Sequence, residues 1–237
     1  MRSRGVERGP TGGRRTWLQW TVLAAALTMA GRGSAVVAQP EPGFEPLFDG
    51  RSLTGWNGDT QGTWRVEEGA IVAGSATVAA PRNEFLATDR EFADFELRLE
   101  YRLDFTKAGN AGVQFRSRRV PDHHEVSGYQ ADIGPGYFGA LYDESRRNRI
   151  LVKPADDVVG RALAGQRDGW NDYRIRCAGP RVQLWLNGVQ TVDWTETEPE
   201  TAVARRGMVA LQIHGGMVGT VRYRNLRVQS LPAAQGR

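Results

Sequence analysis

Three successive segments, GVQFRS at 112–117, SGYQADIG at 127–134 and YFGALYDES at 137–145, alternate apolar side chains with polar ones. A β-strand turns successive side chains to opposite faces of a sheet, so an alternation of period two indicates three neighbouring strands. The apolar face would hold Val113, Phe115, Tyr129, Ala131 and Ile133. The opposite face is then polar, and it is where we look for function.

This polar face combines amide, guanidinium, carboxylate and phenol groups, which suit the hydroxyls of a sugar. The segment LQIHGG at 211–216 adds two polar side chains, with Leu211 and Ile213 facing away. Asp143 would also face away if its strand is regular. The predicted polar face consists of Gln114, Arg116, Gln130, Asp132, Tyr142, Glu144, Gln212 and His214.

The rest of the chain also reads as strand after strand, without an amphipathic helix of normal length. Asn187-Gly188 predicts a hairpin of type I′, and Ala178-Gly179-Pro180 joins the preceding pair of strands. We therefore predict an all-β, concanavalin-like jelly-roll sandwich of two antiparallel sheets, with a closed barrel as the alternative. The predicted strands are 63–66, 70–73, 84–87, 95–103, 112–117, 128–133, 138–142, 173–178, 181–186, 190–194, 209–214 and 221–229.

The first 38 residues read as an export signal. Arg14 and Arg15 directly precede the apolar run at 17–30, and small residues suited to signal peptidase end the segment. The sequence RRTWLQ is similar to a twin-arginine signal, which a receptor reads and which is not an anchor. The apolar run is shorter than the ~20 residues of a spanning helix. We expect a periplasmic or secreted protein without stable membrane insertion after cleavage; a retained N-terminal anchor is the alternative.

The predicted domain organisation follows from this cleavage. A short Pro-rich linker at 39–43 leads into one β-sandwich domain at 44–230, and 231–237 form a tail. About 199 residues follow the leader, which is enough for one domain with a substantial core.

Charge excludes one class of partner. Six arginines and one glutamate lie in the first 38 positions, so the chain's 31 basic and 27 acidic residues fall to 25 and 26 after cleavage. The remaining arginines are interspersed with acids and form no basic stripe, so no nucleic-acid partner is expected. The single cysteine, Cys177, cannot form an intramolecular disulfide, and we expect a thiol in the core.

Several longer segments carry a resemblance to a known family. They are FEPLFDGRSLTGWNG (44–58), AGVQFRS (111–117), SGYQADIGPGYFGALYDESRRNRIL (127–151), GWNDYRIRCAGPRVQLWLNGVQTVDW (169–194), GMVALQIHGG (207–216) and VRYRNLRV (221–228). In this order and combination the chain resembles the 3-keto-disaccharide hydrolase domain family. The resemblance implies a secreted or periplasmic concanavalin-like domain that acts on glycosides whose C3 hydroxyl has been oxidised to a ketone.

A ketone at C3 makes the proton on C2 acidic, so a base can remove it and the group at C1 can leave without an oxocarbenium ion. Elimination then competes with hydrolysis. This route needs a base with a pKa near the working pH, a clamp for the enolate oxygen and an acid at the leaving oxygen. A divalent metal, the one cofactor we consider, could supply the clamp.

The polar face offers candidates for each role. We expect His214 to be a base or metal ligand, and Asp132 a base, a metal ligand or an acceptor for sugar hydroxyls. Glu144 is the candidate acid, with a solvated charged loop as its alternative. Arg116 can bind an enolate or sugar oxygens through its planar fork, or it can pair with a structural carboxylate. Gln114, Gln130, Tyr142, Trp185 and Gln212 are the expected substrate-binding residues.

Three further features stay outside the catalytic assignment. Two adjacent histidines in DHHE at 122–125 cannot easily converge on one ion, so we favour a loop at the rim of the polar face over a metal site. The Trp185 indole can stack on a pyranose or fill the sandwich. Trp56 and Trp170 are expected to pack or to anchor loops.

Two functional classes remain: an enzyme that cleaves 3-keto-glycosides by proton abstraction at C2, and a non-catalytic carbohydrate-binding module on the same scaffold. A jelly-roll endoglucanase is disfavoured. That group carries ExDxxE on one strand, which provides the two carboxylates of glycoside hydrolysis, whereas GYQADIG has a glutamine and one acid.

Overall fold

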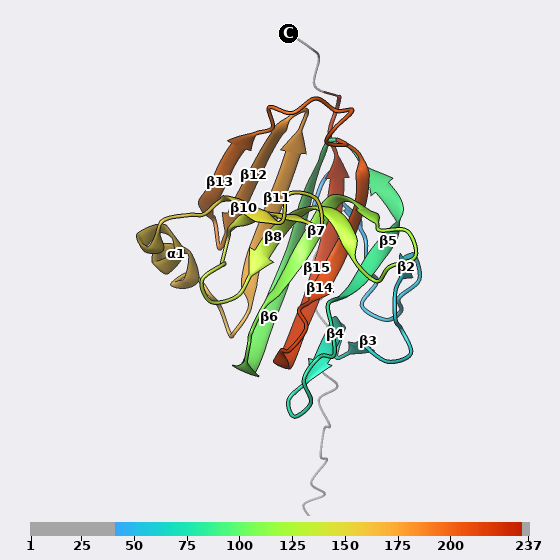
Figure 1. Ribbon diagram of the computed structural model, residues 1–237. Helices are drawn as coiled ribbons and strands as arrows, with labels where there is room; N and C mark the ends of the chain where they lie inside the picture. Colours follow the sequence, from blue (N-terminus) through green and yellow to red (C-terminus); the bar gives the residue numbers. More distant parts are fainter. Residues whose placement is uncertain (1–40, 234–237) are drawn as a thin grey trace, which may run out of the picture. The chain divides into compact units, whose positions relative to one another are not determined.

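The computed structural model describes residues 41–233, so the predicted export signal at 1–38 lies outside the described residues. The regular elements of the described chain are all strands apart from one short helix (Figure 1). In order the elements are β1 (Glu45–Pro46), β2 (Trp56–Asn57), β3 (Trp64–Glu67), β4 (Ala70–Ser75), β5 (Glu84–Phe92), β6 (Phe95–Lys107), β7 (Ala111–Arg119), β8 (Val126–Ile133), β9 (Leu141–Glu144), β10 (Arg149–Val152), α1 (Asp156–Leu163), β11 (Asn171–Ala178), β12 (Arg181–Leu186), β13 (Val189–Thr195), β14 (Gly207–Ile213) and β15 (Val218–Ser230).

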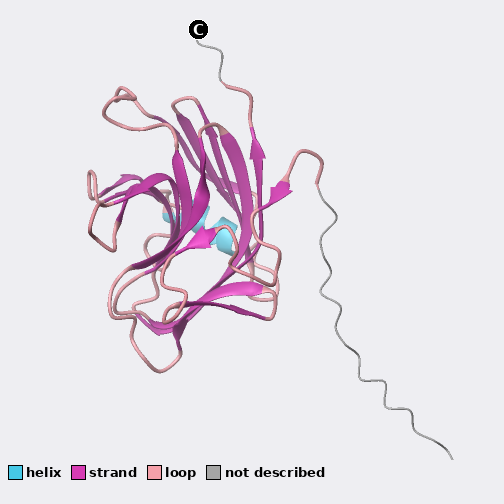
Figure 2. Cartoon of the chain, turned by 90° about the vertical axis from the view of Figure 1, so that its right-hand side faces the viewer, coloured by secondary structure: helices cyan, strands magenta, loops and turns pink. Residues whose placement is uncertain are grey.

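The strands form two antiparallel sheets. Sheet A runs β13-β12-β11-β6-β15-β4-β3, with β1 paired to β15, and sheet B runs β10-β9-β8-β7-β14-β5-β2. Figure 2 shows the two layers of strands, and the buried apolar side chains of both sheets form one core between them. Rings meet across this core: Phe95 of sheet A lies 6.5 Å from Phe115 of sheet B, and Trp194 lies 5.9 Å from Tyr129. The predicted two-sheet sandwich is confirmed.

The turn prediction at Asn187-Gly188 is also confirmed. Both residues have positive φ, 48° and 79°, as a type I′ turn requires, and Leu186 pairs with Val189 on either side. Asparagine tolerates the left-handed region and glycine adopts it freely, so this pair joins β12 to β13 without strain.

The segment from 138 to 163 differs from the predicted strand pattern in three ways. The strand predicted at 138–142 begins only at Leu141, because Gly136 and Gly139 take positive φ and extend the preceding turn. The helix α1 spans only eight residues, below the length at which periodicity separates a helix from a loop. Strand β10 follows directly on a charged turn and was not predicted.

The outer faces of the two sheets differ in character. That of sheet A carries partly exposed ion pairs, such as Arg174 with Glu96 at 2.7 Å and Arg224 with Glu100 at 2.7 Å. That of sheet B is largely buried, and its apolar part is a separate cluster of Phe85, Ala87, Val126, Met208 and Ala210. Within 41–233 there is no helix with the length and apolar character needed to cross a membrane.

Candidate functional site

Strand register brings most of the predicted polar face together on the outer face of sheet B. Gln212 of β14, Gly112 of β7 and Asp132 of β8 lie side by side in one row. Gln114, Gln130 and Tyr142 form the next row, and Glu144 lies opposite Gly128 in the row after that. We call Gln114, Gln130, Asp132, Tyr142, Glu144 and Gln212 the polar strip.

A chain of hydrogen bonds runs through the polar strip and ends at Asp132. The Gln114 amide donates to Oε1 of Gln130 at 2.6 Å, and the Gln130 amide donates to Oδ1 of Asp132 at 2.5 Å. The Ser117 hydroxyl lies 3.0 Å from Oε1 of Gln114. Gln114, Gln130 and Asp132 are all buried, so these hydrogen bonds hold the Asp132 carboxyl in one orientation.

The carboxyl of Asp132 has a raised pKa. Its side chain is only 2% exposed, and burial raises its pKa to about 7, with the charge of Glu144 adding to the rise and the Gln130 hydrogen bond opposing it. Oδ2 of Asp132 is buried and has no hydrogen-bond partner among the described residues. A carboxylate with one oriented oxygen, one free oxygen and a pKa near neutrality is suited to general base catalysis.

Glu144 has a similar pKa for a related reason. Burial raises its pKa to about 7, the charges of Glu125 and Asp143 add to this, and the backbone N–H of Ser145 opposes it. Asp132 and Glu144 lie two rows apart, roughly 13 Å along the strands. Tyr142 lies in the row between Asp132 and Glu144. Burial is the largest cause that raises the pKa of its phenol, and the charges of Glu144 and Asp132 raise it further. The strip therefore carries two carboxyls that titrate in the same range.

Glu125 is a functional candidate that strand alternation does not reveal, because DHHE lies in the loop before β8. Its Oε1 accepts from Nδ2 of Asn83 at 3.0 Å, although β7 and β14 separate the strands that follow these residues. The segment before β8 therefore crosses the outer face of sheet B. Oε2 of Glu125 is buried and makes no hydrogen bond to any described residue, and its charge acts on Glu144. DHHE thus lies at the edge of the polar strip.

Gln212 contributes the most unusual polar group of the site. Its side chain is fully buried, yet neither its Nε2 nor its Oε1 has a partner in the described part of the chain. Burying an amide without hydrogen bonds is costly, so such a group calls for an explanation. A bound ligand oxygen at this row would satisfy it.

Two tyrosines of sheet A hold the backbone of this row from beneath. The Tyr223 hydroxyl lies 2.9 Å from the carbonyl oxygen of Gln212 and 3.1 Å from that of Gly112. The Tyr173 hydroxyl donates to the carbonyl oxygen of Asp132 at 3.2 Å. Both side chains are fully buried, so the core itself positions the row that carries Asp132 and Gln212.

Arg116 does not lie on the polar strip, contrary to the alternation. A β-bulge interrupts β7 after Phe115, and Arg116 takes a φ of 47°. Its guanidinium donates to the carbonyl oxygens of Ala93 and Gly179, both at 2.8 Å, and pairs with Asp94 at 2.8 Å. The alternative reading, a structural ion pair, is the one the structure supports, because one inserted residue reverses the faces of a strand.

His214 is not on a strand, since β14 ends at Ile213. Its side chain is exposed, and its Nδ1 lies 2.7 Å from the carbonyl oxygen of Gly215. The structure does not bury it with Asp132, because the chain turns away at Gly215-Gly216.

Trp185 belongs to the other sheet. It lies on β12 of sheet A, where the Arg174 guanidinium stacks over its ring at 4.2 Å. An exposed aromatic side chain near Tyr142 is that of Tyr137, which is 41% exposed in the loop between β8 and β9. The alternation that the sequence suggests over 137–145 does not hold at Tyr137, because the residues before Leu141 form a turn.

Other expectations agree with the structure. Asp143 faces away from the polar strip, is fully buried and pairs with Arg146 at 2.8 Å. Cys177 is buried in the core, where burial raises its pKa to about 12. The side chain of Trp56 anchors a loop, because its indole N–H donates to the carbonyl oxygen of Leu47 at 2.8 Å.

The residues present do not form a metal-binding set. Among residues 41–233 no three His, Cys, Asp or Glu side chains converge as ligands. His123 and His124 stack on each other, with ring centroids 4.2 Å apart. The polar strip, as far as the structure describes it, thus presents hydrogen-bonding and acid–base groups and no preformed set of ligands for an ion.

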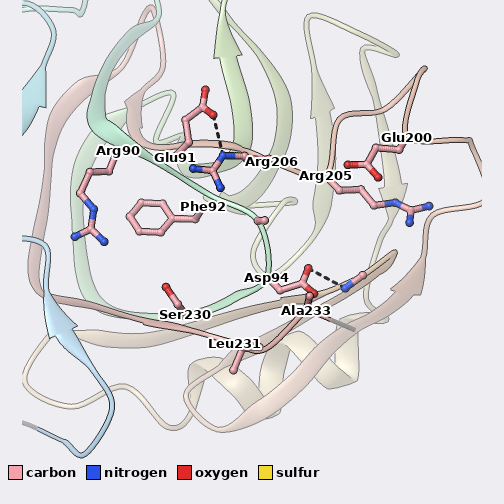
Figure 3. A pocket seen from close by; sticks show the side chains of 12 residues that line it. Arg90, Glu91, Phe92, Asp94, Glu200, Arg205, Arg206, Ser230, Leu231 and Ala233 are labelled. Carbon is pink, nitrogen blue, oxygen red and sulfur yellow. Dashed lines mark hydrogen bonds and ion pairs between the residues drawn. The ribbon is translucent and has the colours of Figure 1, made fainter. Parts of the chain in front are cut away.

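A cavity of about 520 Å³ is lined by residues that do not belong to the polar strip (Figure 3). It is lined at one side by Arg90, Glu91 and Arg206, and Arg206 pairs with Glu91 at 3.3 Å. Asp94, which holds Arg116, lies at another side and accepts from the Gly179 N–H at 2.9 Å. None of the predicted site residues lines this cavity.

The outer face of sheet B holds more than one carboxyl, in line with the predicted polar face, which includes Asp132 and Glu144. Strand β8 carries a single acid, but Glu144 of β9 and Glu125 of the loop before β8 add carboxyls from other elements. The absence of ExDxxE from one strand therefore does not leave the face with a single carboxyl.

Comparisons with known proteins agree with this architecture. A family model for 3-keto-alpha-glucoside-1,2-lyase-like domains matches residues 43–229. No curated protein matches the chain.

Solved structures share the fold at low identity. A candidate glycosyl hydrolase of Parabacteroides distasonis has a TM-score of 0.58 at 18% identity, over 80% of this chain and 94% of that one. The carbohydrate-binding module CBM66 of Bacillus subtilis has a TM-score of 0.55 at 16% identity, over 76% of this chain and 98% of that module. The Bacillus licheniformis β-glucanase has a TM-score of 0.51 at 8% identity, over 80% and 97%. The fold thus occurs in proteins described as enzymes and in a binding module.

Proposed function

Because this chain belongs to the 3-keto-alpha-glucoside-1,2-lyase-like domain family, we propose that it cleaves glycosides whose sugar ring carries a ketone at C3. The observation that carries the proposal is the Asp132 carboxyl, buried, oriented by Gln130 and with a pKa of about 7. Such a carboxyl is matched to removing a carbon acid's proton near neutral pH.

The reaction proceeds as an elimination. Oδ2 of Asp132 takes the proton from C2, and the C–H electron pair enters an enolate that the C3 ketone stabilises. The pair then forms the C1–C2 double bond as the C1–O bond breaks, which restores the ketone. The leaving oxygen receives the proton of Glu144. The enzyme is reset when the proton on Asp132 is passed, through solvent, to Glu144.

Gln212 supports the enolate. Its unpartnered Nε2 lies in the same row as Asp132 and can donate to the oxygen on C3, where negative charge develops. A preorganised donor in a buried site stabilises such charge strongly. Gly112, between them, has no side chain; a Cβ there would come within 2.6 Å of the Gln130 amide carbon. The glycine thus makes room for the Gln130 side chain that orients Asp132.

The net product depends on water. Elimination alone gives an enone sugar and a free alcohol, whereas addition of water to the enone completes an overall hydrolysis. Tyr142 is partly exposed on the strip and Tyr137 is exposed in the loop before β9, so their rings can stack on the sugar ring or its aglycone.

A non-catalytic carbohydrate-binding module is the second candidate, and the fold it shares with CBM66 favours it. The polar strip would then bind a sugar through the same amides without turnover. The two candidates differ in what Asp132 does: an enzyme needs its carboxyl for turnover, a binding module only for affinity.

The deciding experiment uses the purified protein with an aryl 3-keto-α-glucoside and with its unoxidised parent, with and without a chelator. Aglycone release and enone absorbance are followed together. Release from the keto-sugar alone supports the proposal, and loss of that release in chelator would assign a divalent metal. Release from the parent would indicate an ordinary glycosidase, and binding without release would indicate a binding module.

We further propose that the protein acts outside the cytoplasm, on the strength of the leader at 1–38. Mass spectrometry of the protein from cell fractions tests this. A periplasmic or secreted form lacking the leader is expected, and a full-length cytoplasmic form would contradict export.

A further inference from the structure

A second cavity, of about 470 Å³, is lined by strands of sheet A and by the loop that follows α1. Its volume lies within the range of small-molecule sites in proteins. Trp170 provides the aromatic wall, and Glu100, Asp172, Asn187 and Arg224 provide polar groups. None of these residues belongs to the polar strip, which lies on the other sheet. We call this cavity the Trp170 pocket.

A tight turn of the backbone holds Trp170 in place. Asp168 and Gly169 take φ values of 51° and 81°, and Arg167 and Trp170 exchange two backbone hydrogen bonds, at 3.0 and 2.8 Å. This is a tight turn of type I′ geometry, which projects Trp170 at its end. The Arg224 guanidinium lies 3.9 Å from the ring centroid and supports the partly exposed indole from one side.

A second tight turn forms the facing wall. Asn187 of the Asn187-Gly188 turn accepts from the N–H of Asp172 at 2.8 Å and donates to Oδ1 of Asn171 at 2.8 Å. It donates as well to the carbonyl oxygen of Ala162, at 2.8 Å, which ties the turn to α1. The pocket is thus preorganised by backbone turns, and a ligand would bind without ordering a loop.

Two carboxyl groups of the pocket lie side by side on neighbouring strands. Asp172 and Glu100 lie directly opposite each other on β11 and β6, an arrangement that is unfavourable for two like charges. Glu100 is satisfied by Arg224 and by Asn225, both at 2.7 Å. Among the residues that the structure describes, none makes a hydrogen bond or ion pair with the Asp172 carboxylate.

These features favour one class of ligand. An aromatic ring beside carboxylate and amide acceptors binds the apolar face and the hydroxyls of a sugar. Glu100 and Arg224 neutralise each other, and the remaining lining charges, Arg167, Asp168 and Asp172, are of mixed sign. An anionic ligand would meet the unpaired Asp172, so a neutral one is favoured. We propose that the Trp170 pocket binds a neutral hexopyranose unit of an oligosaccharide, as a second sugar site.

This proposal does not depend on chemistry at Asp132, and its test removes that chemistry. The purified chain carrying Asp132→Asn is titrated with hexasaccharides of glucose in α-1,4, β-1,4 and β-1,3 linkage, and the indole N–H signal of Trp170 is followed by NMR. The Trp170→Phe variant assigns that signal. At least one hexasaccharide is expected to shift it.

Affinities of variants complete the test. Trp170→Ala is expected to weaken binding roughly tenfold, and Asp172→Asn several-fold, because stacking and charged hydrogen bonds are lost. Trp185→Ala is the matched control, since Trp185 is stacked by an arginine on the same sheet but does not line the pocket. Its affinity should stay within about twofold of the parent. The proposal is overturned if no hexasaccharide shifts the Trp170 signal, or if Trp170→Ala and Asp172→Asn bind as tightly as Trp185→Ala.

Discussion

The Nε2 amide of Gln130 donates to Oδ1 of Asp132 at 2.5 Å, while Oδ2 of the same carboxyl, also buried, has no partner among the described residues. One oxygen is thereby used for orientation and the other is left for chemistry. Asp132 differs in this respect from acids of the chain such as Glu45, Glu96 and Glu100, whose carboxylates pair with arginines.

Asp132→Asn tests the proposed base directly. The amide keeps the shape but cannot take the C2 proton, so kcat should fall by roughly 10²- to 10⁴-fold, with little change in KM. Steady-state kinetics on an aryl 3-keto-α-glucoside measures this. Asp193→Asn, on exposed β13, is the control and should leave kcat unchanged. A variant that loses affinity but keeps kcat would point to a binding role.

Activity should follow a bell-shaped pH profile. The proposed reaction needs Asp132 ionised and Glu144 protonated, and both carboxyls have a pKa of about 7. The competent form is therefore most abundant near pH 7 and declines on both sides, with apparent pKa values that belong to the pair. A log kcat/KM plot between pH 4 and 10 measures this, and a rate that rises to a plateau above pH 8 would exclude Glu144 as an acid.

Glu144→Gln should separate the leaving-group step from proton abstraction. Without the acid, a poor leaving group such as a second sugar should react about 10²-fold more slowly. A nitrophenol, which leaves without protonation, should be affected far less. Equal losses with both substrates would assign Glu144 to another role.

Stability should depend on pH in a way that identifies Asp132. The pKa of this carboxyl is 3.8 in the unfolded chain and about 7 in the folded protein, so between these values the folded state holds a proton that the unfolded state has lost. The unfolding free energy therefore falls as pH rises through this window. Asp132→Asn removes this dependence, so its gain over the parent should grow by on the order of 1 kcal/mol per pH unit between about pH 4 and 7 and level off above pH 7. Urea unfolding at several pH values measures the difference.

Arg116→Ala should damage stability rather than chemistry. The guanidinium is 1% exposed, pairs with Asp94 and donates to two carbonyl oxygens, so its loss should lower the unfolding free energy by roughly 3 kcal/mol. At temperatures where the variant is folded, kcat should be close to that of the parent. Arg181→Ala, an exposed pair with Asp193, is the control and should cost less than about 1 kcal/mol. A large fall in kcat with unchanged stability would return Arg116 to the active site.

The candidate site was partly predictable, because strand alternation is a local property. It identified Gln114, Gln130, Asp132 and Gln212 as one face, and the register of β14, β7 and β8 confirms their adjacency. The same rule failed at Arg116, where a single bulge redirects the side chain, and at His214, where the strand ends one residue earlier. Sequence carries little information about where a bulge is inserted.

The sequence by itself determined the family, the all-β class and the tight turn at Asn187-Gly188, because each depends on local pattern and on the φ values that single residues tolerate. Only the tertiary structure decided which sheet receives Trp185, which loop brings Glu125 to Glu144, and how deeply Asp132 is buried. Those properties depend on strands that are distant in the chain but adjacent in a sheet. The pKa of Asp132 is their product, since burial and a neighbouring charge exist only after the sheets have assembled.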